Sequence, residues 1–424
     1  MSYIDRFDEA IGNAPAAGFT LDHVIAQQQF AARRRRRVVA GGLAAVAVLV
    51  ISVAAVGVAR FGTGPWSPAI PGATAVSGWR ELPGSPLSPR VQALGLWTGE
   101  EALIIGGSDT PCPPNADCAD DPDPLTSAAA VNPDTGRWRS IADLPVALRW
   151  AQGAVVGGVA YVQGHTTDGG FALLAYVIDA DRWEQLPQPG GEADLQLVAA
   201  GDLLVAVRGS DENTPGPDYV YDRPQRRWRQ LPADPLGAGF DRAMAWTGRE
   251  LVLFDHELVP DPGARKPAVT RAAVFDPATG EWRRLPDSQQ LSTGPWLAAG
   301  GRLVNPSLGG ADGGQVGNWG RTYPNGGILD PATGTWSALP DPPGGFEAGG
   351  SAYGATSAVY AGQPGPVLNT AAGVWQNVAP LPLGDANEHT VVAAGNRMLI
   401  FGGVRWGGTD PELLADVWLW TPDT

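Results

Sequence analysis

One short phrase recurs along the chain and limits the folds that are open to it. Three copies, Asn132–Trp138, Asp276–Trp282 and Asp330–Trp336, all read Asn/Asp-Pro-x-Thr-Gly-x-Trp. In such a phrase the Asp or Asn side chain caps a turn, Pro fixes φ at the next position, and Gly takes a left-handed conformation before Trp begins a new strand. The phrase therefore predicts a hairpin that is repeated several times.

The intervals between the copies indicate how many strands each repeat contains. Weaker copies end at Trp183, Trp228 and Trp375, a partial copy ends at Trp79, and successive spacings are 59, 45, 45, 54, 54 and 39 residues. Ahead of each full phrase lies a second hairpin of apolar strands around a glycine turn, as in residues 94–107. A repeat of about 40–50 residues with four strands is typical of a β-propeller blade. The sequence therefore predicts an all-β, seven-bladed propeller.

The two ends of the repeat array complement each other. Residues 77–83 contain the Gly-x-Trp half of the phrase without an apolar strand before it, whereas residues 416–424 end on a strand without a Gly-x-Trp after it. Joined together, they make one complete repeat. We therefore predict that the N-terminal strand around Trp79 closes the last blade of the ring.

These features resemble the kelch-repeat family of β-propellers, in the form of a membrane-anchored, bacterial-type kelch-like protein. The resemblance covers about residues 77–424 and implies a fold, but it implies no particular activity because propellers carry many unrelated functions. The motifs that carry it are the diglycines Gly106-Gly107 and Gly402-Gly403, the degenerate forms Gly164-His165 and Gly209-Ser210, and Tyr221 before a turn.

An uncharged apolar run, Val38–Ala59, lies ahead of the repeats and is 22 residues long. At about 1.5 Å per residue, a helix over this run can cross a hydrocarbon core of about 30 Å. Five arginines, Arg33–Arg37, precede the run and only Arg60 follows it, which places the N-terminus in the cytoplasm and the repeats outside it. An uncleaved signal-anchor is favoured over a cleaved signal peptide or a twin-arginine export signal, because the run is long for either.

This interpretation divides the chain into four segments. They are a cytoplasmic tail at 1–37, a transmembrane helix at 38–60, a Pro/Gly linker at 61–76 and the propeller at 77–424. Thr20 can cap a short helix in the tail. That helix could dock a cytoplasmic partner, but a helix that simply continues into the membrane span is favoured.

The charge of the chain is distributed unevenly. Residues 1–60 carry seven Arg and four Asp or Glu, a net charge of +3, so the remaining residues carry −18 of the total −15. A strongly acidic body without basic stripes argues against nucleic acid and anionic lipid as its partners.

The two cysteines, Cys112 and Cys118, lie in one loop rich in Pro and Asp. Outside the cytoplasm this spacing predicts a disulfide that closes a small loop, with two free thiols as the alternative. A zinc site is disfavoured because no further ligands lie nearby. Four aspartates of the loop could bind calcium, although acidity that only aids solubility is favoured. They are Asp117, Asp120, Asp121 and Asp123.

In kelch-like propellers the loops that lead into the innermost strands surround one mouth of the central channel, and an Arg there is common. The resemblance therefore implies a binding rim. Its residues are Arg90, Arg149, Trp150, Asp194, Arg242, Glu347, Glu388 and His389, with Phe240, Trp296 and Phe346 nearby. Such a mixture suits an anionic peptide, a carbohydrate or a protein loop. The alternative for each arginine is a structural pair with a carboxylate or backbone group of a neighbouring blade.

These observations predict a membrane-tethered, extracytoplasmic recognition module that presents its rim to a protein or glycan. The alternative is a membrane-anchored carbohydrate-active enzyme, sialidase-like or mutarotase-like, that uses rim carboxylates and arginines. No catalytic residue, metal or cofactor is predicted, because the sequence lacks a nucleophile elbow, a phosphate loop and a His-Glu-x-x-His motif. The phrase tryptophans are expected in the core of the blades.

Overall fold

Antiparallel β-sheet makes up nearly all of the regular structure. The computed structural model describes residues 78–421 with gaps at 113–123, 192, 210–215, 258–268, 289, 291–295, 309–324, 339–351, 356–357, 362–366, 370–373, 377–378, 380, 385 and 408–409. Within these residues there are seven four-stranded sheets, which is the number that the repeats predict. A single 3-10 turn, Ile178–Ala180, is the one helical element of the described part.

We number the sheets as blades 1 to 7 along the chain. Blade 1 contains β2 (Leu94–Trp97), β3 (Ala102–Ile105), β4 (Ala128–Asn132) and β5 (Arg137–Ile141). Blade 2 contains β6 (Arg149–Val156), β7 (Val159–His165), β8 (Phe171–Val177) and β9 (Arg182–Leu186). Blade 3 contains β10 (Leu195–Ala200), β11 (Leu203–Arg208), β12 (Tyr219–Asp222) and β13 (Arg227–Gln230). Blade 4 contains β14 (Gly239–Trp246), β15 (Leu251–Glu257), β16 (Thr270–Asp276) and β17 (Glu281–Arg284).

The later blades follow the same order. Blade 5 contains β18 (Leu297–Ala299), β19 (Arg302–Leu308), β20 (Asn325–Asp330) and β21 (Thr335–Ala338). Blade 6 contains β22 (Ala352–Ala355), β23 (Ala358–Ala361), β24 (Val367–Asn369) and β25 (Val374–Gln376). Blade 7 contains β26 (Thr390–Ala394), β27 (Arg397–Gly407), β28 (Asp410–Thr421) and, as its fourth strand, β1 (Gly78–Glu81).

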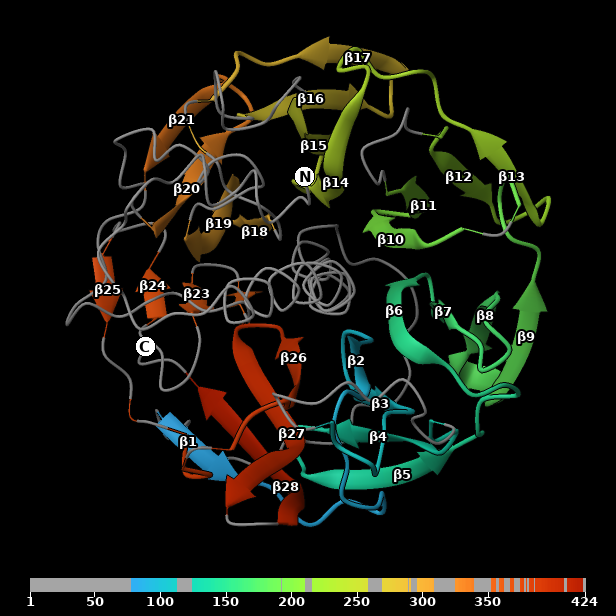
Figure 1. The fold of residues 1–424 in the computed structure, drawn as a ribbon, viewed down its shortest axis with the longest axis vertical. Coiled ribbons are helices and arrows are strands. Elements are labelled where there is room, and N and C mark those ends of the chain that lie inside the picture. Colours follow the sequence, from blue (N-terminus) through green and yellow to red (C-terminus); the bar gives the residue numbers. More distant parts are fainter. Residues whose placement is uncertain are drawn as a thin grey trace, which may run out of the picture. The chain divides into compact units, whose positions relative to one another are not determined.

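The first strands of the blades form a closed circle. Contacts run from β2 to β6, β10, β14, β18, β22 and β26 in turn, and β26 contacts β2. Figure 1 shows the sheets placed around a common centre, with the first strand of each blade nearest to it. The described residues therefore form an all-β fold of the β-propeller kind.

The ring is closed by strands from opposite ends of the chain, as the sequence predicts. Strand β1 pairs with β28 in antiparallel register, from Gly78 opposite Thr421 to Glu81 opposite Trp418. Because β28 also pairs with β27, β1 is the outermost strand of blade 7. The pairing covers part of the outer edge of β28 and leaves the four-residue strand β1 as the outer edge of the blade.

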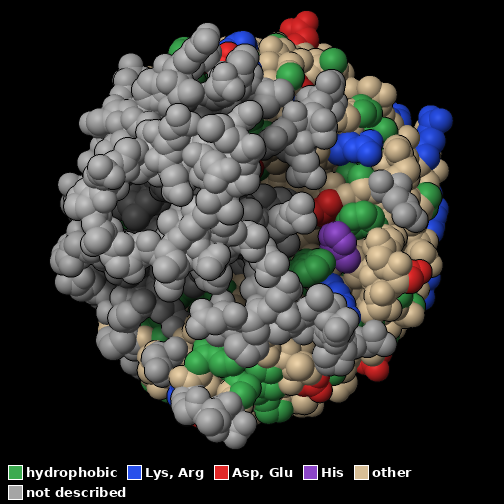
Figure 2. Space-filling view, in the orientation of Figure 1, with side chains coloured by type: hydrophobic (Ala, Val, Ile, Leu, Met, Phe, Trp, Pro, Cys, Tyr) green, Lys and Arg blue, Asp and Glu red, His purple; other side chains and the backbone are tan. Residues whose placement is uncertain are grey.

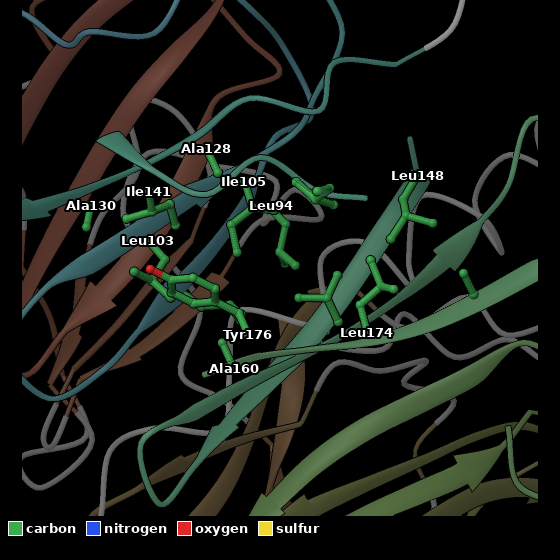
Figure 3. Close-up of a cluster of buried hydrophobic side chains, with 14 residues drawn as sticks. Leu94, Leu103, Ile105, Ala128, Ala130, Ile141, Leu148, Ala160, Leu174 and Tyr176 are labelled. Atoms are coloured by element: carbon green, nitrogen blue, oxygen red, sulfur yellow. The ribbon is translucent and has the colours of Figure 1, made fainter. Parts of the chain in front are cut away.

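The hydrophobic core lies between neighbouring blades. Figure 3 shows one cluster, in which Leu94 and Leu103 of blade 1 lie close to Leu174 and Tyr176 of blade 2, all of them buried. Similar clusters lie between blades 7 and 1, 2 and 3, 3 and 4, and 4 and 5. Each blade therefore depends on its neighbours for the burial of its apolar faces, as in other repeat architectures.

The phrase tryptophans link each blade to the preceding one, a role that their predicted core position did not include. Their rings are half-buried, and each indole N–H donates to a backbone carbonyl near the end of the preceding blade. The pairs are Trp79 with Ala379 (2.7 Å), Trp138 with Pro83 (3.0 Å), Trp183 with Ala142 (2.7 Å), Trp228 with Pro187 (2.9 Å), Trp282 with Pro232 (2.9 Å) and Trp336 with Pro286 (2.7 Å).

The glycine of the phrase belongs to the same joint between blades. Gly136 has a φ of +67°, and a Cβ added to it would lie 2.7 Å from Cδ of Pro83. The glycine is therefore needed both for the left-handed turn and for the close approach of the preceding blade. The same approach recurs at Gly334, where a Cβ would lie 2.9 Å from Cδ of Pro286, whereas a Cβ at Gly280 would meet no neighbouring atom within 4 Å.

Among the described residues, no helix has the length and apolar character of a membrane span. The predicted span at 38–59, the tail before it and the linker after it lie outside the described residues.

Candidate functional site

One end of the ring collects the residues that begin the first strand of each blade. In blade 2, Arg149 at the start of β6 pairs with His165 at the end of β7, which pairs with Phe171 at the start of β8. The starts of first and third strands therefore lie at the same end of each blade as the end of the second strand. We call this end of the ring the rim face.

In four blades, a residue with a left-handed backbone conformation lies at or just before the start of the first strand, at the rim face. Gln92, Trp150, Asp241 and Glu388 have φ values of +56°, +49°, +51° and +55°, which non-glycine residues rarely adopt. We call these four residues the corner residues. The residue before each corner residue pairs with the end of the second strand, in the pairs Val91 with Ser108, Arg149 with His165, Phe240 with His256, and Asn387 with Val404. The four positions are therefore equivalent in the four blades.

The diglycines of the repeat make room for these corners. In blade 7, Gly402 and Gly403 have φ values of +66° and +111°, and they lie opposite the corner at Glu388. A Cβ on Gly402 would lie 2.6 Å from the backbone oxygen of Arg90 in blade 1. The diglycine thus lets one blade approach the start of the next at the rim face.

Trp150 presents a large apolar surface at its corner. It is 46% exposed, and no other large hydrophobic side chain of the described residues is classed as exposed. Its ring meets His165 edge-on, with centroids 5.0 Å apart at 88°, and His165 in turn contacts Phe171 at 4.3 Å. Burial lowers the pKa of His165, although the charge of Asp194 opposes this effect, so the imidazole is neutral at pH 7.

Mixed side chains surround this part of the ring. Figure 2 shows hydrophobic, histidine, acidic and basic side chains next to one another on the described part of the face in view. Asp194 is half-buried before β10 and accepts a hydrogen bond of 3.4 Å from the buried Gln152 amide. The Gln152 carbonyl oxygen is buried and has no hydrogen-bond partner among the described residues. A half-buried carboxylate and a buried amide therefore lie together between blades 2 and 3.

Two corner residues from adjacent blades bond to each other. The Gln92 amide donates a hydrogen bond of 3.1 Å to the Glu388 carboxylate, so the pair bridges blades 1 and 7. Burial raises the pKa of Glu388, and the Gln92 bond opposes that rise. A carboxylate and an amide are thus fixed side by side at the rim face.

Two of the predicted rim arginines have structural roles. Arg90 is 2% exposed and donates to the Gly106 carbonyl at 2.8 Å and to the Ser127 hydroxyl at 3.0 Å, both in its own blade. The Arg242 side chain is 1% exposed and pairs with Asp218 at 2.8 Å and Asp234 at 3.2 Å, which are residues of blade 3 and its connection to blade 4. The alternative of a structural pair with a neighbouring blade therefore describes Arg242, whereas Arg90 bonds within its own blade.

The other predicted rim residues differ in their access to the mouth. His389 is held between the backbone carbonyls of Gly402 (2.6 Å) and Ala386 (2.9 Å), and burial lowers its pKa while these carbonyls oppose the change. Trp296 is buried and stacks on Phe254 at 4.5 Å, so it belongs to the core. The remaining placements are Arg149, half-buried at the start of β6, Phe240, buried against His256, and Glu347 and Phe346, outside the described residues.

Sequence reasoning missed Gln92 and Asp241 as rim residues. Like Trp150, each follows directly a residue that pairs with the second strand at the rim face, so an alignment of the blades on these pairs would have found them. It also missed the buried pair Arg271–Asp255, in which both guanidinium bonds are short, at 2.8 and 2.6 Å. That pair joins β15 and β16, the second and third strands of blade 4.

No metal site is evident in the described part of the chain. No group of three or more His, Cys, Asp or Glu side chains there could hold a metal ion. Cys118 and the four loop aspartates lie outside the described residues, so the disulfide to Cys112 and the calcium alternative stay predictions. The described rim therefore offers an indole, carboxylates and amides, which are groups suited to binding a ligand.

Comparison with known proteins adds little to this geometry. No protein-family model matches the chain. No curated protein matches it either. A solved structure described as "Structure of YjhT" is similar to it, with 15% sequence identity and a TM-score of 0.43, and the match covers 80% of this chain and 97% of that one. The fold class of this chain therefore rests on its own seven sheets.

Proposed function

We propose that this chain is a membrane-tethered, extracytoplasmic recognition module of the kelch-like class, which presents its rim face to a protein or glycan ligand. The observation that carries the proposal is Trp150, a large side chain that is 46% exposed on a strained backbone beside His165 and Phe171. Exposed aromatic rings with polar groups around them are frequent anchors of binding sites.

The arginines favour recognition over the enzymatic alternative. A sialidase-like site needs several arginines that face one anionic group, but Arg90 and Arg242 are buried in structural bonds. Arg149 is the predicted rim arginine that is still partly exposed. The described rim thus lacks an arginine cluster, and binding without turnover is the function that its geometry supports best.

The membrane tether is part of the same proposal and rests on the sequence. The uncharged run Val38–Ala59 and the arginines before it support a signal-anchor with the ring outside the cytoplasm. Reporter fusions test this topology. An alkaline phosphatase fused after Thr424 should be active, and a green fluorescent protein fused before Met1 should fluoresce. Release of the phosphatase into the soluble extracytoplasmic fraction would show instead that the segment is cleaved.

Binding is tested with the full chain in lipid nanodiscs. Peptide and oligosaccharide panels are screened by thermal shift, and each compound that binds is then incubated with the protein and followed by NMR for conversion. We expect at least one compound to raise the melting temperature without being converted, and Trp150→Ala to abolish the rise. Conversion of the compound would support the enzymatic alternative. A shift that survives Trp150→Ala would place the ligand elsewhere.

A further inference from the structure

We infer that the corner residues Gln92, Trp150, Asp241 and Glu388 are the ligand-contacting set of the rim face and that their ligand is an uncharged glycan. This inference rests on the proposed recognition function and names its ligand class. Two features of the corner residues support it, namely the strain of their backbone and the chemistry of their side chains.

Left-handed backbone strain recurs at the equivalent corner position of four blades. Of the six non-glycine residues with positive φ in the described part of the chain, four are the corner residues. Most other left-handed positions there are occupied by glycine, for which this conformation carries no steric penalty. Glycine would fit a corner more easily than an indole or a carboxylate. Strain of this kind persists where the side chain has a function.

The side chains at the corners are chemically different, which is the second argument. A purely structural device would repeat the same side chain in each blade, as the phrase tryptophans do. Instead the corners present an amide, an indole and two carboxylates. Glu388 bonds to Gln92 at 3.1 Å, and Asp241 lies 3.4 Å from His256 at the end of β15. The four corners therefore place three kinds of group at the rim face.

The combined chemistry of the four corner side chains indicates which class of ligand they can bind. The face of an indole stacks on the C–H face of a sugar ring, while carboxylates and amides accept and donate hydrogen bonds to hydroxyl groups. An anionic sugar would meet two carboxylates without Arg90 or Arg242, which are buried, on a body that carries −18. Only Arg149 of the predicted rim arginines in the described part of the chain is still partly exposed, so the charge pattern favours an uncharged glycan over an acidic one.

The aromatic geometry argues against a cation as the ligand. A cation is held best where it lies over the face of an aromatic ring, and often among several rings. Here His165 meets Trp150 edge-on at 88°, and Phe171 lies against His165 rather than facing Trp150. Trp150 therefore offers a single indole, 46% exposed, and no aromatic cage. This surface suits the C–H face of a pyranose better than a lysine or arginine side chain.

The test uses the full chain in nanodiscs and three groups of probes. The uncharged probes are cellopentaose, maltopentaose and chitopentaose, the anionic probe is oligogalacturonate, and the cationic probe is oligolysine. Binding is measured by calorimetry at low and high salt. We expect an uncharged probe to bind with a Kd that is insensitive to salt, because no ion pair forms.

Variants then assign the binding to the corners. Trp150→Gly and Glu388→Gln should each weaken binding by about tenfold or more, as expected for anchor residues. Trp150→Phe should retain most of it, since the aromatic face remains. The matched control is Arg226→Gly, which relieves the same left-handed strain (φ +52°) in the turn between β12 and β13, at the opposite end of blade 3. It should leave the Kd unchanged. Trp150→Gly should melt no lower than Trp150→Ala, which shows that the fold is intact.

Each other outcome overturns the inference in a distinguishable way. Uncharged probes that bind wild type and both corner variants equally would show that the corners are not the contact set. Binding of oligolysine alone, with a steep loss at high salt, would show that the ligand class is wrong and leave the recognition function standing. Binding of no probe here, together with no thermal shift in the wider panels, would overturn both the inference and the proposed function.

Discussion

Replacing Arg242 with Met should reveal how much the joint between blades 3 and 4 depends on a buried cation. The Arg242 side chain is 1% exposed, and its partners Asp218 and Asp234 are 5% and 13% exposed. Removing one member of a buried ion pair typically destabilises a protein by about 3–5 kcal/mol, because the other charge stays buried without its partner. We therefore expect Arg242→Met to lose about 3–5 kcal/mol of unfolding free energy at pH 7.

The loss should depend on pH in a definite direction. Burial raises the pKa of Asp218, and the charge of Arg242 opposes that rise. Removal of Arg242 should therefore raise the pKa of Asp218 further. A carboxyl group whose pKa is higher in the folded state than in the unfolded state, which is about 4, stabilises the fold when protonated. That contribution is lost as the pH rises through the folded pKa. The deficit of Arg242→Met should therefore be largest near neutral pH and shrink toward about pH 4.

Urea denaturation of the full chain in detergent, followed by tryptophan fluorescence between pH 4 and 8, measures this dependence. The matched control is Arg284→Met, because Arg284 and Asp287 form a pair of 2.8 Å with side chains 43% and 47% exposed. An exposed pair of this kind contributes less than about 1 kcal/mol. The reasoning is refuted if Arg242→Met costs no more than the control, or if its cost is the same at every pH.

Three further predictions concern the joints between blades and the cysteine loop. Trp138→Phe removes the indole bond to Pro83 and should cost about 0.5–1.5 kcal/mol in urea denaturation. Gly136→Ala should cost more than Gly280→Ala: both have a positive φ, but a Cβ meets Pro83 at Gly136 and open space at Gly280. Neither cysteine should react with a thiol reagent until a reductant is added, and labelling followed by mass spectrometry checks this.

The fold could be predicted from the sequence because its information is local and repeated. The phrase that ends in Trp138 recurs at intervals of 39 to 59 residues, and the incomplete repeats at the two chain ends fit together, as the pairing of β1 with β28 confirms. The number of sheets follows from hairpins whose strands are neighbours in the sequence. The closure of the ring follows from the match between the incomplete repeats at the two chain ends. No knowledge of side-chain packing was needed for either.

The rim could be predicted less well, because burial at the ring mouth depends on neighbouring blades. Arg90 precedes β2 and Trp150 is the second residue of β6, yet Arg90 is 2% exposed and Trp150 is 46% exposed. Trp150 is a corner residue, whereas Arg90 lies two residues before the corner residue of its blade, and the sequence alone does not display this difference. Gln92 was missed for the same reason, since its place at a corner depends on a positive φ.

The closing strand β1 also fastens blade 7 to both of its neighbours. Trp79 donates to Ala379 at the end of blade 6, and Arg80 donates at 2.9 Å to Pro133 in the turn between β4 and β5 of blade 1. Gly78, where β1 begins, pairs with Thr421 at the end of the blade opposite the rim face. Tension applied through the segment ahead of Gly78 would act first on β1, a strand of four residues, and its detachment would leave blades 7 and 1 held together by the contact of β26 with β2 and by the core between them.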